Sequence, residues 1–261
     1  ALRALATRRD PKAVELSLTA LTSPDLALRR EAVVQLGQLR DPRGREPVAK
    51  LLTHPQLSLP AALALAELND RRAVDRLVTE LRRGARRPDV IGALGRLGDA
   101  RAVPALLQCL VGPDGTVWSD RDAILTALAE IGEPAVQAIL QHLPSANPRA
   151  RLGALAAAEG LPDARALPRL LPLVQDPNVE TQLLAIRAVG RLQDAAATEP
   201  LAARLADPMP KVQAAAAEAL GQIGDARAAP ALLPLLASPT PQVRQWAAAA
   251  LGAMRSAAAV E

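Results

Sequence analysis

Hydrophobic and polar positions follow a block pattern that recurs about every 30 residues along the chain. Each block opens at an acidic residue, runs through an apolar stretch, breaks at a small polar residue before proline, and closes in an Ala-rich stretch. The acidic positions lie 29 to 34 residues apart, at Asp10, Asp41, Asp70, Asp99, Glu133, Asp163, Asp194 and Asp225. Eight positions in so constant a register indicate an internal repeat.

Each block predicts two helices. The acidic residue followed by Pro, Ala or Arg is a helix-start signal, and Pro104, Pro168 and Pro230 fall in the first turn, where a missing N–H costs little. A short helix pair cannot bury its apolar face alone, whereas stacked pairs can. The sequence therefore predicts an all-α fold, an α-solenoid of about eight two-helix repeats.

We expect one repeat domain over residues 1–261. A half repeat covers 1–9, and full repeats start near residues 10, 41, 70, 99, 133, 163, 194 and 225. Pro60 and Pro88 predict shortened second helices, and residues 112–120 are an insertion. The chain begins at Ala1 and shows no polar capping repeat at either end, so we expect a domain cut from a longer chain.

The repeats resemble the HEAT family, specifically the short HEAT-like repeats named after phycobilisome lyases. The best match is the last block, where residues 225–236 fit the family's first helix and residues 243–252 its second. The resemblance covers the whole chain and implies the fold rather than the function. Most such domains are binding scaffolds, and a minority are bilin lyases or hydroxylases.

Composition narrows the choice of function. Half of the residues are hydrophobic, yet the only aromatics are Trp118 and Trp246. This disfavours β-sheet folds and base-stacking nucleic-acid sites. The formal charge of +4 lies in the first half, where 20 basic residues face 16 acidic ones. No apolar segment reaches 18 residues and no signal peptide is visible, so we expect no membrane span and a cytoplasmic protein.

Residues that could carry chemistry are few. His54 and His142 occupy inter-helix turns and are best interpreted as turn residues or helix caps, and Cys109 lies in an apolar helical run expected to face the core. The chain has no His-Glu step, which the HEAT-like hydroxylases require for iron binding. We therefore expect no enzyme activity, no metal and no cofactor.

The predicted binding surface is the concave face formed by the second helices. Positions −7, −6, −3 and +1 from the repeat glycine share one side of the helix. This rule selects Arg30, Glu31, Gln38, Glu67, Arg96, Asp122, Thr126, Glu130, Arg187, Arg191, Glu218, Gln222, Gln245 and Trp246. Trp is enriched at interface hot spots, so Trp246 is either a partner anchor or a contact to a further repeat.

The leading hypothesis is a non-catalytic scaffold that binds a protein or peptide on this face. Two alternatives stay open. One is a bilin lyase-like protein that handles a chromophore, and the other is nucleic-acid binding through the Arg-rich first half, which we regard as disfavoured. A cluster of Arg82, Arg83, Arg86 and Arg87 is either a solvated turn or a patch for an anion or acidic partner. The oligomeric state is left open.

Overall fold

The computed structural model describes residues 11–83, 88–112 and 120–258, and every regular element in these ranges is a helix. The helices form eight consecutive pairs, which confirms the predicted all-α solenoid of two-helix repeats. The predicted half repeat at 1–9 lies outside the described residues. The chain divides into two compact units, residues 1–109 with 119–135 and residues 110–118 with 136–261.

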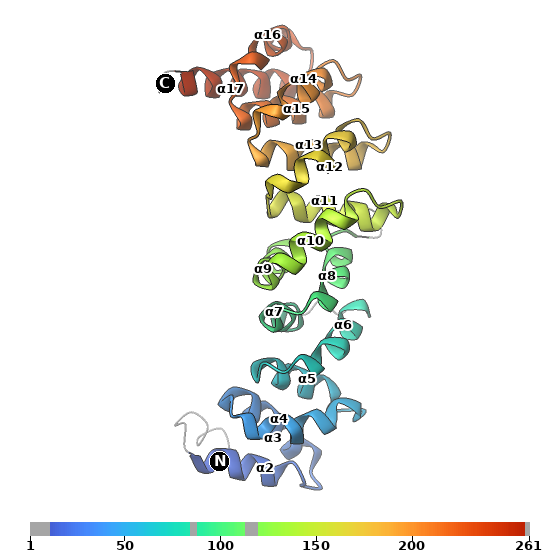
Figure 1. Cartoon of the computed structure of the whole chain (residues 1–261), viewed down its shortest axis with the longest axis vertical. Helices are drawn as coiled ribbons and strands as arrows, with labels where there is room; N and C mark the ends of the chain where they lie inside the picture. The colour runs from blue at the N-terminus through green and yellow to red at the C-terminus, as the bar shows by residue number, and fades with distance from the viewer. Residues whose placement is uncertain (1–10, 84–87, 113–119, 259–261) are drawn as a thin grey trace. The chain divides into compact units, whose positions relative to one another are not determined.

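The first unit contains four helix pairs (Figure 1). Their elements are α2 (Pro11–Ala20), α3 (Leu26–Leu39), η1 (Pro42–Gly44), α4 (Arg45–Ala49), η2 (Lys50–Thr53), α5 (Ser58–Glu67), η3 (Arg71–Ala73), α6 (Val74–Arg82), α7 (Pro88–Leu97), η4 (Ala100–Ala102), α8 (Val103–Cys109) and α9 (Arg121–Ile131), where η marks a 3₁₀ helix.

The second unit repeats the same plan after α10 (Glu133–His142), whose first three residues belong to the first unit. Its elements are α11 (Pro148–Gly160), η5 (Ala164–Ala166), α12 (Leu167–Leu170), η6 (Leu171–Gln175), α13 (Val179–Leu192), η7 (Ala195–Ala197), α14 (Thr198–Arg204), α15 (Pro210–Ile223), η8 (Ala226–Ala228), α16 (Ala229–Leu232), η9 (Leu233–Ala237) and α17 (Pro241–Ala258).

Six of the eight acidic repeat positions are N-caps, as their sequence context predicts, whereas Glu133 is itself the first residue of α10 and Asp10 lies outside the described residues. Asp41, Asp70, Asp99, Asp163, Asp194 and Asp225 each accept a hydrogen bond from the backbone N–H two residues later. The turn that follows each cap is a 3₁₀ turn, which leads into the α-helix of the repeat. The carboxylate satisfies an N–H that would otherwise lack a partner at the helix start.

The first helices are less regular than the sequence pattern predicts. In two repeats of the second unit the α-helix lasts one turn and continues as a 3₁₀ helix from Leu171 and from Leu233. Pro172 and Pro234 stand at these points and lack the N–H needed to continue the α-helical bonding. The second helices are 10 to 18 residues long, and α5 and α7 are the shortest of them, with 10 residues each against 14 in α3. This confirms the shortening expected from Pro60 and Pro88.

Within each unit the second helices pack side by side (Figure 1). At four crossings, α3–α5, α7–α9, α13–α15 and α15–α17, the repeat glycine faces an alanine of the next second helix. A Cβ added to Gly95 would stand 2.8 Å from the Cα of Ala127, and one added to Gly190 would stand 2.8 Å from the Cβ of Ala219. Only glycine permits this backbone approach. The residue before the glycine position, such as Leu36, Leu65 or Leu94, is fully buried and forms the core.

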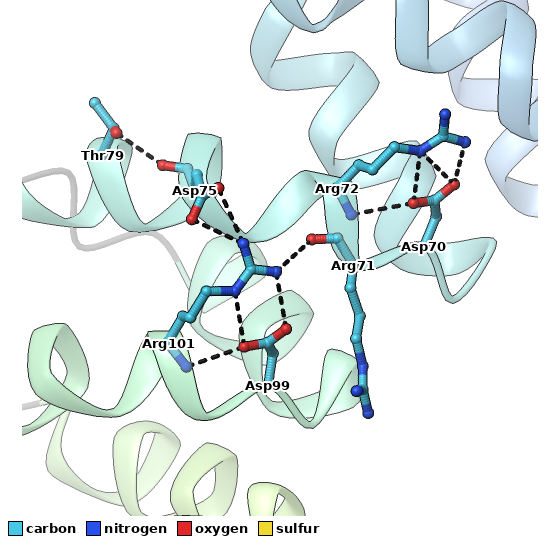
Figure 2. Close-up of polar contacts among 7 residues, drawn as sticks. All are labelled: Asp70, Arg71, Arg72, Asp75, Thr79, Asp99 and Arg101. Carbon is cyan, nitrogen blue, oxygen red and sulfur yellow. Dashed lines mark hydrogen bonds and ion pairs between the residues drawn. The ribbon is translucent and has the colours of Figure 1, made fainter.

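Arginine side chains connect successive first helices on the other side of the first unit (Figure 2). Arg101 binds its own cap Asp99 through Nε and Nη2, at 3.0 and 2.9 Å. It also reaches back to the preceding repeat, where it donates to the Asp75 carboxylate at 3.0 Å and to the Arg71 carbonyl at 3.0 Å. The hydrogen bonds that the Arg101 side chain and backbone N–H donate to Asp99 hold the pKa of that carboxyl below its ordinary value. The acidic and basic repeat positions therefore serve as caps and inter-repeat ties, as the sequence predicts.

Candidate functional site

The candidate site is a groove of about 500 Å³ on the second-helix face of the first unit. Three consecutive second helices, α3, α5 and α7, supply its walls and floor. The lining residues are Arg30, Val34, Gln38, Pro60, Leu63, Ala64, Glu67, Asp89 and Arg96. A volume of this size is in the range of small-ligand and short-peptide sites. We refer to these nine residues as the α3–α7 groove.

Apolar side chains occupy the middle of the α3–α7 groove. Val34 is 39% exposed, and Leu63 beside it on α5 is half-buried. Pro60 and Ala64 complete this apolar floor. The backbones of α3 and α5 approach closely near this floor, where a Cβ added to Gly37 would stand 2.8 Å from the Cα of Ala64. Burying exposed apolar surface of this kind against a partner is favourable and contributes to binding affinity.

An ion-paired triad of Arg40, Glu67 and Arg96 forms the polar side of the groove at the carboxyl-terminal ends of the helices. One carboxylate, that of Glu67, accepts from Nη2 of Arg40 and from Nη2 of Arg96, each at 2.8 Å. The two arginines come from different repeats, so the triad joins three of them. Each guanidinium has five N–H donors, and the glutamate uses only one from each. Both arginines therefore keep donors for a partner.

Two polar residues of the groove have no such engagement. Among the described residues, Arg30 and Gln38 form no hydrogen bond or ion pair, and both side chains are exposed. They lie on α3 four residues before and four residues after Val34, so all three share one side of the helix. Asp89, at the start of α7, accepts a hydrogen bond from the N–H of Val90 at 3.0 Å.

The structure brings together four of the predicted surface residues in this groove: Arg30, Gln38, Glu67 and Arg96. Glu31 is not among the lining residues and accepts a hydrogen bond from Gln35 of its own helix at 2.9 Å. The −6 position thus points away from the groove in α3.

The prediction missed the apolar part of the groove. Val34 and Leu63 occupy position −3 of the repeat, and Pro60 and Asp89 occupy position −6. The positional rule covers all four, but our prediction named mainly polar residues and also omitted the acidic Asp89. An exposed aliphatic residue at −3 is the sequence signal that identifies the groove floor.

The predicted residues on α9 lie on an exposed surface of the first unit. Asp122, Thr126 and Glu130 are all exposed, and the hydroxyl of Thr126 donates to the carbonyl of Asp122 at 2.8 Å. Glu130 reaches toward the crossing at Gly95. None of the three is a lining residue of the α3–α7 groove.

The predicted residues of the second unit are largely bonded to one another or to the fold. Arg187 lies 3.5 Å from Glu159, the residue that stands in the repeat-glycine position of α11. Gln222 donates to Glu218 at 3.5 Å, while Arg191 is exposed. On α17, Gln245 is exposed and Trp246 is half-buried.

A second groove, of about 680 Å³, lies between the last two helices of the second unit. Its walls are apolar, and Leu233 and Leu236 are 56% and 42% exposed. Neither Trp246 nor any other predicted surface residue is among the residues that line it. Of the arginine cluster, Arg82 and Arg83 are exposed. Arg86, Arg87 and Trp118 lie outside the described residues.

The histidines and the cysteine have structural surroundings. Nδ1 of His54 accepts from the N–H groups of Gln56 and Leu57 at 3.2 Å, which confirms a capping role in the turn. The ring Nδ1 of His142 lies 2.7 Å from the carbonyl of Ala138. Cys109 is only half-buried, so the expectation that it faces the core was wrong. It is the last residue of α8, although the residues on either side of it in the run, Leu107 and Leu110, are buried.

In the parts of the chain that the structure describes, no three His, Cys, Asp or Glu side chains gather as a metal site. The same residues include no single helix long and apolar enough to span a membrane. The consecutive helices α9 and α10 meet that criterion of length and composition only when they are taken together.

Comparison with known families gives two matches. The HEAT repeat model matches residues 1–59, 136–208 and 198–261. The PBS lyase HEAT-like repeat model matches residues 89–112, which include most of α7 and α8. No curated protein sequence matches the chain.

Several solved structures are similar to this chain. Kap121p bound to Pho4p is 14% identical over 98% of this chain and 36% of its own, with a TM-score of 0.68. Human deoxyhypusine hydroxylase is 22% identical, covering 97% of this chain and 99% of its own, with a TM-score of 0.42. The CpcE–CpcF phycocyanin lyase of Nostoc sp. PCC7120 is 23% identical, covering 93% and 94%, with a TM-score of 0.39. This chain thus spans little more than a third of Kap121p.

Proposed function

The chain belongs to the HEAT-repeat family, and on this premise we propose that it is a non-catalytic scaffold that binds a segment of a partner protein in the α3–α7 groove. The observation that carries the proposal is the groove itself. It joins an apolar floor to polar banks on the face that the repeat pattern selects for binding. Apolar area supplies affinity, and a few placed polar groups supply orientation.

The similarity to Kap121p supports a protein partner. That karyopherin is bound to Pho4p in one structure and to the extreme carboxyl terminus of the phosphatase Cdc14p in another, and the TM-scores to this chain are 0.68 and 0.67. Both bound molecules are proteins. We also propose that the protein is cytoplasmic.

The alternatives gain less support from the groove. Its charged lining residues are Arg30 and Arg96 against Glu67 and Asp89, so it offers no single-sign field for a nucleic-acid backbone. It contains no aromatic side chain to pack against a tetrapyrrole, which leaves the bilin lyase-like alternative resting on resemblance alone.

The test uses a matched pair of substitutions on α3. Val34 and Leu28 are both 39% exposed, but only Val34 lines the groove. A library of displayed random peptides is selected against the wild-type protein, and the recovered peptides are titrated against Val34→Arg and Leu28→Arg. We expect Val34→Arg to weaken binding by about tenfold, equivalent to about 1.4 kcal/mol, and Leu28→Arg to leave it unchanged.

Two results would count against the proposal. One is a selection that yields no peptide with saturable binding. The other is a set of peptides that bind the two variants equally, because their site would then lie elsewhere. Circular dichroism of both variants verifies that the helices are intact.

A further inference from the structure

We propose that the α3–α7 groove takes an extended peptide with an acidic, an apolar and an amide side chain at alternate positions. This inference rests on the proposed function and names the chemistry of the partner segment. The three positions correspond to the three rows of groove residues that start at Arg30, at Val34 and at Gln38.

The spacing of the rows carries the first part of the argument. Arg30, Val34 and Gln38 follow each other at four-residue intervals on α3, and four residues of α-helix rise about 6 Å. In an extended chain, side chains on one face recur every two residues, or about 6.6 Å. A peptide lying along α3 therefore presents every second side chain to successive rows without changing its conformation.

The first row calls for an acidic residue. Arg30 is exposed, and no described residue pairs with it. The other lining residues at this end of the repeat pattern are Pro60 on the neighbouring α5, which is uncharged, and Asp89 on α7, one helix further away. A partner carboxylate can therefore approach this guanidinium without displacing an existing ion pair, and the bidentate fork of arginine suits a carboxylate.

The second row calls for an apolar residue. Val34 and the half-buried Leu63 face the groove at the same repeat position on neighbouring helices. A branched aliphatic side chain placed between them covers apolar surface on both. Burial of one such side chain contributes about 1.5 to 3 kcal/mol when it is complete, so this row supplies most of the affinity.

The third row calls for an amide. Gln38 has no described partner and offers both a donor and an acceptor. Glu67 holds the same repeat position on α5, and its two carboxylate oxygens already accept hydrogen bonds from Arg40 and Arg96. A charged partner residue at this row would compete with that triad, whereas an amide can bond Gln38 without breaking it.

The experiment uses fluorescein-labelled peptides measured by fluorescence polarisation. One peptide carries Glu, Leu and Gln at alternate positions with Ser between them, and its counterpart carries Lys in place of Glu. Both are made in both sequence orders, because the groove does not fix the direction of the chain. The proteins are the wild type, Arg30→Glu and Val34→Arg.

We expect the Glu peptide to bind the wild type about threefold to fivefold more tightly than the Lys peptide, the range expected of an exposed ion pair. Arg30→Glu should reverse that preference, and Val34→Arg should weaken binding of both peptides by about tenfold. Equal binding of the two peptides to the wild type, with both weakened in Val34→Arg, would overturn this inference and leave the groove as a binding site.

No binding of either peptide to the wild type would also overturn the inference. The library selection then decides the proposed function separately, since it makes no assumption about the partner sequence. If Arg30→Glu keeps the preference for the Glu peptide, a residue other than Arg30 binds the peptide carboxylate. That result would contradict the assignment of an acidic residue to the first row.

Discussion

Replacing Gly95 by alanine tests whether the repeat glycine is required for the close crossing of second helices. The added methyl group would stand 2.8 Å from the Cα and 3.0 Å from the Cβ of Ala127, and it would also meet the side chain of Glu130. Carbon atoms in contact normally lie 3.5 to 4.0 Å apart, so α7 and α9 must separate. The backbone of α9 cannot move without disturbing the buried residues of its own repeat.

The expected magnitude follows from two opposing effects. Overpacking a tight contact costs about 1 to 3 kcal/mol, while alanine gains up to about 1 kcal/mol over glycine in helix propensity. The free energy of unfolding should therefore fall by about 0 to 3 kcal/mol, with a central value of about 1.5 kcal/mol. Gly92→Ala is the matched control on the same helix, because its methyl group would meet only the flexible end of Arg96, at 3.4 Å. It should stabilise the protein by up to about 1 kcal/mol.

The measurement is urea denaturation followed by circular dichroism at 222 nm for the wild type and both variants. The account expects the order Gly92→Ala, wild type, Gly95→Ala from most to least stable. If Gly95→Ala unfolds at the same urea concentration as Gly92→Ala or at a higher one, steric necessity does not explain the glycine at the crossing.

Three further predictions concern the charged residues. Asp99→Ala removes a helix cap and the anchor of Arg101, and it should lower the unfolding free energy by about 1 to 2 kcal/mol in the same urea assay. Asp75→Ala removes an exposed carboxylate of the same network and should lower the unfolding free energy by under about 0.5 kcal/mol. Because the pKa of Asp99 is lowered in the folded state, its contribution is present above the unfolded pKa of about 3.9. Thermal melts should thus lose stability as the pH falls below about 4, and less so in Asp99→Asn; parallel curves would contradict this. Glu67→Gln should change stability by under about 0.5 kcal/mol and raise the affinity for the Glu peptide by about twofold, measured by polarisation; weaker binding would refute the charge argument.

The period and composition of the sequence were enough to predict the fold. The acidic caps, the glycine at four of the crossings and the leucine or valine before the glycine recur in register, and each has a steric or hydrogen-bonding reason to recur. Local consistency of this kind specifies a repeat. The changes from α-helix to 3₁₀ helix at Pro172 and Pro234 were not predicted, because a proline in the first helix can signal either a helix start or a helix break.

The candidate site could be predicted only in part. The face was deducible from helical periodicity, and four groove residues were found in this way. Whether a side chain such as Gln222 faces a partner or packs on its neighbours depends on contacts between repeats, which period alone does not fix. That Val34 and Leu63 line one groove depends on how α3 and α5 pack together, which the sequence period does not specify.

The most direct test of the central claim is a methyl NMR titration of the full chain with a peptide recovered from the library selection. The account predicts saturable shifts of the Val34 and Leu63 methyl signals, with Leu233 and Leu236 of the second groove unchanged. Shifts confined to Leu233 and Leu236, or saturable binding with no change at Val34 and Leu63, would contradict the assignment of the α3–α7 groove as the partner site.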